Sequence, residues 1–87
     1  MTRYYLHPTS IQAGPATWKT GSLLLALGAF RPRRMHYWRN QPQTYSFALN
    51  GRTTVETLQA GLDANLGGYY WQVRDLAEDR AADRAKA

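Results

Sequence analysis

The chain has 87 residues, 44% of them apolar and 13% aromatic, with no cysteine and a net charge of +5. This length allows one domain, and the aromatic content excludes a disordered chain. The lack of cysteine excludes disulfides, zinc fingers and a cysteine nucleophile, and it favours a reducing compartment, so we expect a cytoplasmic protein. No stretch of about 18 apolar residues is present, which excludes a simple membrane-spanning helix.

The first two predicted elements are a strand and a helix. Residues 1–8 carry two adjacent tyrosines and end on a proline, which lacks the N–H that a sheet needs, so they predict a short strand. After a turn at 9–14, Pro15 suits the first turn of a helix, and Gly28 suits its C-terminal cap. We therefore expect a helix between these two residues.

The extent of this helix is ambiguous. Gly21 costs a helix about 1 kcal/mol relative to alanine, so we allow for a helix that begins only at Ser22. The apolar run 23–30 can continue the helix or form a buried strand, because periodicity does not decide a run this short. We expect this run in the core, since a helix of this length spans about 12 Å and a bilayer core about 30 Å.

A β-hairpin is predicted next. Residues 33–40, after the break at Arg31-Pro32, are rich in tyrosine and tryptophan and predict a second strand. Residues 44–49 alternate small polar with large apolar side chains and predict a third strand. The polar connector 40–43 fits a four-residue loop, and Asn50-Gly51 ends the hairpin in a turn.

The second helix has the clearest pattern. Its apolar residues recur at the spacing of one helix face: Val55, Leu58, Leu62 and Leu66. We expect the helix over 53–66, with Thr53 or Thr54 as its N-terminal cap. A fourth strand is predicted at 69–74.

The element order β-α-β-β-α-β is that of the ferredoxin-like arrangement. It predicts a small α+β domain in which two helices cover one face of an antiparallel four-stranded sheet and leave the other face open. We place this domain at residues 1–76, followed by an exposed, charged helical tail at 77–87 that buries almost nothing. An α+β roll with another strand order is the alternative.

Alternation along the strands assigns residues to the two faces of this sheet. Because Tyr45, Phe47 and Leu49 form the more apolar side of the third strand, we expect them to face the helices. The same rule assigns these neighbours to the helix side: Met35, Tyr37, Tyr69, Trp71 and Val73. The open face is then expected to carry Arg34, His36, Trp38, Thr44, Ser46, Ala48, Tyr70, Gln72 and Arg74.

Charge is distributed unevenly along the chain. Residues 1–55 contain seven basic and no acidic residues, whereas residues 56–87 contain six acidic and four basic residues. A basic surface without internal counter-charges attracts anions, which indicates nucleic acid, an acidic protein surface or anionic lipid as the class of partner.

The expected open face combines aromatic rings with arginine, a composition typical of protein-binding hot spots and of surfaces that stack bases. We expect a partner to contact these residues: Arg33, Arg34, His36, Trp38, Arg39, Tyr70 and Arg74. The alternative is that Trp38 and Tyr70 are buried beneath the C-terminal helix or in a dimer. The sequence leaves the oligomeric state open.

Two functions fit this surface. In the first, a non-enzymatic binding protein docks on a nucleic-acid-handling host complex, an acidic protein surface or nucleoprotein, and blocks or modulates it. Small size and the lack of motifs are typical of phage and mobile-element inhibitors such as anti-CRISPR proteins, an analogy that no single residue carries. In the second, the surface binds single-stranded RNA or DNA directly.

Catalytic and cofactor chemistry has little support in the sequence. The two histidines stand at no metal-ligand spacing, no glycine-rich phosphate loop precedes a helix, and we expect neither a metal nor a cofactor. The remaining enzyme hypothesis is a small basic ribonuclease toxin that uses His36 and Tyr37 with Arg34 and Arg39. Adjacent residues of a strand alternate between faces, which argues against it.

Overall fold

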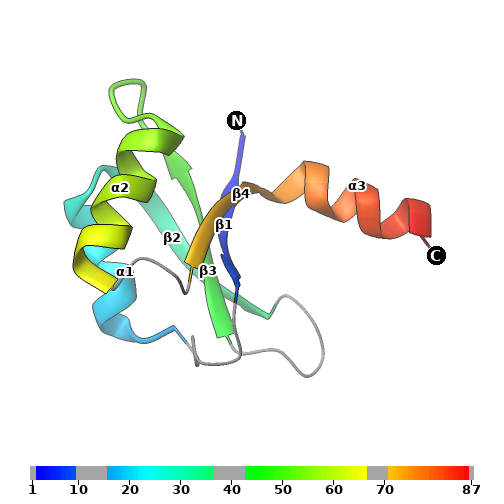
Figure 1. Ribbon diagram of the computed structural model, residues 1–87, viewed down its shortest axis with the longest axis horizontal. Helices are drawn as coiled ribbons and strands as arrows, with labels where there is room; N and C mark the ends of the chain where they lie inside the picture. Colours follow the sequence, from blue (N-terminus) through cyan, green and yellow to red (C-terminus); the bar gives the residue numbers. More distant parts are fainter. Residues whose placement is uncertain (1, 10–15, 37–42, 67–70, 87) are drawn as a thin grey trace.

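The computed structural model describes residues 2–9, 16–36, 43–66 and 71–86, except the side chains of His36 and Lys86. Its elements are, in chain order, β1 (Tyr4–Pro8), α1 (Trp18–Ala26), β2 (Ala29–His36), β3 (Gln43–Leu49), α2 (Val55–Leu66), β4 (Trp71–Asp75) and α3 (Leu76–Lys86). The strands form one antiparallel sheet in the order β2-β3-β1-β4 (Figure 1). The predicted α+β class and ferredoxin-like order are therefore confirmed, with α3 as an additional helix.

The hydrophobic core lies between the sheet and the helices α1 and α2. The most deeply buried apolar side chains of this layer are Leu6, Leu24, Phe47, Leu58 and Leu62. As predicted, Tyr45, Trp71 and Val73 belong to the same core. Burying one large apolar side chain contributes about 1.5–3 kcal/mol, which makes this layer the main source of stability.

The apolar run 23–30 is divided between two elements. α1 ends two residues before Gly28, and β2 begins directly after it. Gly28 has a φ of 102°, and a Cβ at this position would lie 2.2 Å from Thr53 Oγ1. Since glycine alone adopts this conformation and fits this space without strain, Gly28 determines where helix changes to strand.

Gly21 lies inside α1, which begins at Trp18 and not as late as Ser22. A Cβ on Gly21 would lie 3.0 Å from the ring of Tyr45. The absence of a side chain therefore lets α1 pack directly on this ring, and the packing offsets the low helix propensity of glycine.

Thr54 is the residue that caps α2. Its Oγ1 accepts a hydrogen bond from the Thr57 N–H at 3.1 Å, and its carbonyl oxygen accepts one from the Leu58 N–H at 3.0 Å. Thr53, the other predicted cap, instead donates its hydroxyl to Asn50 Oδ1 at 3.1 Å in the turn between β3 and α2. The predicted helix is thus confirmed with its cap at Thr54.

A side chain of α2 occupies the outer edge of β4. Gln59 Nε2 donates to the carbonyl oxygen of Trp71 at 2.9 Å, and Gln59 Oε1 accepts from the N–H of Val73 at 2.8 Å. One amide group therefore makes the two hydrogen bonds that the backbone of a further strand would make with β4.

α3 begins where β4 ends and projects from the side of the sheet opposite to α1 and α2 (Figure 1). Asp75 Oδ1 accepts a hydrogen bond from the Glu78 N–H at 3.1 Å, which caps the first turn. The Leu76 N–H donates to the carbonyl oxygen of Arg3 at 3.0 Å and ties the start of the helix to β1.

Most of α3 is exposed, but its first turns pack on the sheet. Leu76 is buried, and the side chain of Asp79 is only 12% exposed. The expectation that residues 77–87 bury almost nothing is therefore wrong at Asp79. No helix in the described ranges is both long enough and apolar enough to cross a bilayer.

Candidate functional site

One row of cross-strand partners runs over the side of the sheet that α1 and α2 do not cover. The register pairs Ser46 of β3 with both Arg33 and Tyr5, and it pairs Tyr5 in turn with Arg74. Because Tyr5 precedes the core residue Leu6, this row faces away from the core. We call this side of the sheet the α3 face. Its described strand and flanking residues are Arg3, Tyr5, His7, Phe30, Arg33, Met35, Thr44, Ser46, Ala48, Gln72 and Arg74.

The middle of the α3 face is buried. Tyr5, Thr44 and Ala48 are fully buried, and Ser46 is nearly so. Arg3 Nη2 donates to Ser46 Oγ at 3.0 Å, and the first turns of α3 reach Tyr5. The predicted orientation of Thr44, Ser46 and Ala48 is thus confirmed, whereas the prediction that this part of the sheet is open is wrong, because all three residues are buried.

Arg34 lies on the opposite side from the one predicted. It pairs with Tyr45, its Nε donates to Tyr45 Oη at 3.3 Å, and its guanidinium carbon lies 5.9 Å from the centre of that ring. Met35 pairs with Thr44 and therefore belongs to the α3 face. The prediction fails because β2 is an edge strand, where a long arginine side chain covers the rim of the core and still keeps its charge in water.

An ion pair joins β4 to α3. Arg74 Nε lies 2.8 Å from Asp79 Oδ2, and Arg74 Nη2 donates to Asp79 Oδ1 at 3.1 Å. The Tyr5 hydroxyl also donates to Asp79, and His7 Nδ1 lies 2.9 Å from Tyr5 Oη. Since the single hydroxyl proton goes to Asp79, the His7 Nδ1 carries the proton of the second hydrogen bond. Asp79 thus holds α3 on the sheet and gives Arg74 a partner within the chain.

The surroundings of His7 change the pKa of its imidazole. Burial is the main cause that lowers the pKa of His7, and the charge of Arg74 lowers the pKa further. The carboxylates of Asp79 and Asp83 oppose this shift. The net effect keeps the imidazole neutral near pH 7, so it adds no positive charge to the α3 face.

The structure separates the predicted partner-binding residues. Arg33 is exposed on the α3 face, Arg34 is exposed on the other side of β2, and Arg74 is half-buried against Asp79. Trp38, Arg39 and Tyr70 lie outside the described residues, as does the side chain of His36. For the ribonuclease hypothesis, Tyr37 and Arg39 lie outside the described residues, and Arg34 contacts Tyr45.

Sequence reasoning missed Arg3, which lies at the centre of the basic part of this face. Its Nη2 donates to the carbonyl oxygen of Arg31 at 2.9 Å as well as to Ser46. Burial and then the charges of Arg33 and Arg31 lower the pKa of Arg3. We call Arg3, Arg33 and the neighbouring Arg31 the arginine cluster, because the other two lie close enough to act on the charge of Arg3. Among the described residues, the hydrogen-bond acceptors of Arg3 include no carboxylate. Alternation from Tyr5 was the signal that could have placed Arg3 here.

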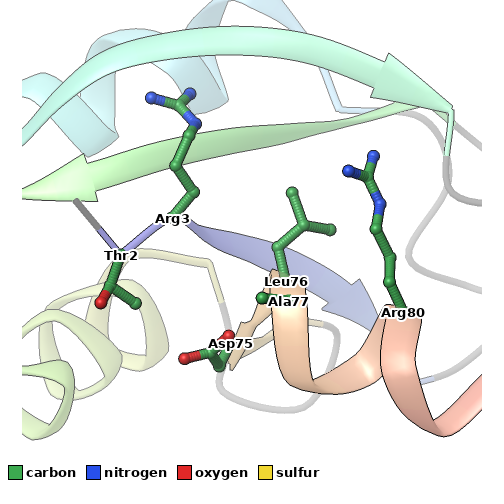
Figure 2. Close-up of a pocket in the computed structure, with 6 residues that line it drawn as sticks. All are labelled: Thr2, Arg3, Asp75, Leu76, Ala77 and Arg80. Carbon is green, nitrogen blue, oxygen red and sulfur yellow. The ribbon is translucent and has the colours of Figure 1, made fainter.

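A pocket of about 570 Å³ lies beside the arginine cluster, between the start of β1 and the start of α3. It is lined by Thr2, Arg3, Asp75, Leu76, Ala77 and Arg80. Figure 2 shows the side chains of Arg3, Leu76 and Arg80 extending in the same direction, with Leu76 between the two guanidinium groups. The pocket therefore combines positive charge with an apolar centre.

The guanidinium groups of this region offer positive charge and hydrogen-bond donors. Within the described ranges, no three histidine or acidic side chains gather in a way that could hold a metal ion. Guanidinium groups recognise carboxylates and phosphates through charge-assisted hydrogen bonds. Comparison with protein-family models, with curated proteins and with solved structures gives no match to this chain.

Proposed function

We propose that this protein is a non-enzymatic binding protein that docks the arginine cluster of its α3 face on an acidic surface of a partner protein. The observation that supports this proposal is the position of the cluster. The three arginines lie close enough that Arg31 and Arg33 lower the pKa of Arg3, and no described carboxylate contacts Arg3. The same face neutralises Arg74 with Asp79.

The contrast between these two sets of arginines favours binding over a purely structural role. Like charges held together destabilise a fold, and a structural arginine is normally paired, as Arg74 is. A cluster in which Arg3 contacts no carboxylate of the described residues gains most from an external anion, because the partner's carboxylates remove the repulsion. Electrostatic attraction of this kind also speeds association and selects the orientation of the partner.

The described aromatic residues of this face favour a protein partner over a nucleic acid. Proteins that bind single strands stack the bases on exposed aromatic rings. Of the aromatic side chains that the α3 face contributes within the described ranges, Tyr5 is fully buried, and Phe30 and His7 are half-buried. We further propose that the partner belongs to a complex that handles nucleic acid and that docking modulates it, on the strength of the small size and the charge of the chain.

Arg33 and Arg34 offer a matched test of this proposal. They are adjacent, both exposed, and on opposite sides of β2. The tagged protein and its Arg33→Glu and Arg34→Glu variants are used to recover partners from a nuclease-treated host lysate. We expect Arg33→Glu to lower recovery by about fivefold or more, because charge reversal at an interface replaces attraction by repulsion, and Arg34→Glu to leave recovery unchanged.

A second measurement separates a protein partner from a nucleic acid. Fluorescence anisotropy with a mixed-sequence single-stranded oligonucleotide is recorded at several salt concentrations, because affinity for phosphates falls steeply with salt. We expect no binding that depends on Arg33. Loss of the partner on nuclease treatment, or equal effects of the two charge reversals on recovery at unchanged melting temperature, would contradict the proposal.

A further inference from the structure

We infer that the pocket between β1 and α3 binds an acidic side chain from a short peptide segment of the partner, with the carboxylate between Arg3 and Arg80. This inference rests on the proposed docking function and adds to it the chemical group that is recognised. Two arginines from different elements line this pocket, and their side chains extend in the same direction on either side of Leu76 (Figure 2). A carboxylate between two arginines accepts charge-assisted hydrogen bonds from both.

Arg3 is held in place before any ligand arrives. Both of its described side-chain hydrogen bonds, to Arg31 O and Ser46 Oγ, use Nη2. A guanidinium has five N–H groups, so the three on Nε and Nη1 remain for a ligand, counting hydrogen bonds to described residues. A donor that is already ordered loses little freedom on binding, which favours affinity.

Arg80 completes the site from the other side of Leu76. It is exposed on the first turns of α3, whose position is fixed by the contacts of Asp79 and by the Leu76 N–H bond to Arg3 O. The buried Leu76 lies between the guanidinium groups and gives the pocket an apolar centre. The methylene groups of a glutamate or aspartate side chain would pack on this centre.

The other lining residues select a peptide over a phosphate-rich ligand. Asp75 borders the pocket, and its Oδ1 is used to cap α3 while its Oδ2 accepts no hydrogen bond from a described residue. A carboxylate here repels a multiply charged polyphosphate more strongly than the single carboxylate of one side chain, and it accepts a hydrogen bond from a peptide N–H, as the Thr2 hydroxyl also can. The volume of about 570 Å³ exceeds one carboxylate and suits a segment of a few residues.

The test uses a fluorescein-labelled, C-terminally amidated hexaglutamate peptide as the probe and fluorescence anisotropy to measure its dissociation constant. Arg80→Gln removes one pocket guanidinium, and Arg84→Gln makes the same change one turn further along the same helix, outside the pocket lining. We expect Arg80→Gln to weaken binding about tenfold, the range of one charge-assisted hydrogen bond, and Arg84→Gln to change it less than about twofold.

A second readout locates the probe. Titration with the peptide should shift the methyl NMR signals of Leu76 in the unmodified protein and in Arg84→Gln, and much less in Arg80→Gln. Equal affinities of the two variants, an absence of binding at millimolar peptide, or unshifted Leu76 methyl signals would overturn the inference. Displacement of the peptide by a single-stranded oligonucleotide with the same dependence on Arg80 would overturn the choice of a protein ligand.

The outcomes distinguish this inference from the proposed function. If Arg33→Glu abolishes partner recovery while Arg80→Gln and Arg84→Gln behave alike, docking stands and the pocket assignment is wrong. If the peptide binds with the expected dependence on Arg80 but nuclease-treated lysate yields no Arg33-dependent partner, the pocket stands and the docking proposal fails.

Discussion

The two faces of the sheet share the same strands but are held by different forces. The face under α1 and α2 is a continuous apolar layer that includes Leu6, Phe47 and Leu62. The α3 face is ordered by a few directional contacts, such as the Arg74–Asp79 ion pair and the hydrogen bond from Thr44 Oγ1 to Leu6 O at 2.6 Å. Stability therefore resides mainly in the first face, and the second is the face on which we propose that a partner docks.

The largest effect is expected from truncating the apolar layer. Phe47→Ala should lower the free energy of unfolding by about 3–5 kcal/mol, because it leaves a cavity that the core fills only in part. Ser46→Ala, at the neighbouring position on the α3 face, should lower it by about 1 kcal/mol through the loss of one hydrogen bond. Denaturant titration followed by circular dichroism measures both, and equal losses would break the distinction between the faces.

An intermediate effect is expected from the ion pair that holds α3. Asp79→Asn should lower the free energy of unfolding by about 1–2 kcal/mol, since it removes the charge that Arg74 and Tyr5 contact. Glu78→Gln makes the same charge change on the neighbouring, exposed residue and should alter stability by less than about 0.5 kcal/mol.

Hydrogen exchange shows whether this loss is local. The amides of α3 should exchange faster in Asp79→Asn, whereas those of β1 and β3 should keep their protection. Uniformly faster exchange over the whole sheet would show that α3 and the core unfold as one unit, and it would remove the separation drawn between the two faces.

The smallest effect concerns pH. The pKa of His7 is lowered in the folded protein, chiefly by burial, from its ordinary value of 6.5. The unfolded chain therefore takes up a proton first as the pH falls through about 6.5, so the contribution of His7 to stability is present above that pH and is lost below it. Melting temperature measured between pH 8 and 5 should fall for the unmodified protein and fall less for His7→Gln. Parallel curves for the two proteins would show that His7 is not responsible.

The parts of the fold that follow from local pattern were predictable. The spacing of Leu58 and Leu62 gave a helix face, and the alternation around Phe47 gave the correct buried side of β3, because both depend on the period of a single element. The run 23–30 could not be assigned, since its division depends on the backbone of Gly28 and on the distant Thr53.

The candidate site depends on contacts between elements, which the sequence does not record. Arg34 was placed on the wrong side because the apolar Met35 suggested the opposite alternation, and β2 carries a register shift between Phe30 and Arg33. Arg74 and Asp79 stand five residues apart across a strand–helix junction, a separation that matches no helical pairing rule. The pairing depends on how the first turn of α3 lies against β1 and β4.

The Gln59 amide has a consequence for how copies of this protein behave when crowded. An exposed sheet edge invites another chain to add a strand, and repeated addition leads to fibres. Gln59 is already hydrogen-bonded to the carbonyl oxygen of Trp71 and to the N–H of Val73. An incoming strand at β4 must therefore first break these two hydrogen bonds. The other edge contains Pro32, which lacks an N–H, beside Arg31 with a φ of 53°. Both edges of the sheet therefore resist the addition of another strand, which opposes polymerisation of the protein through its sheet edges.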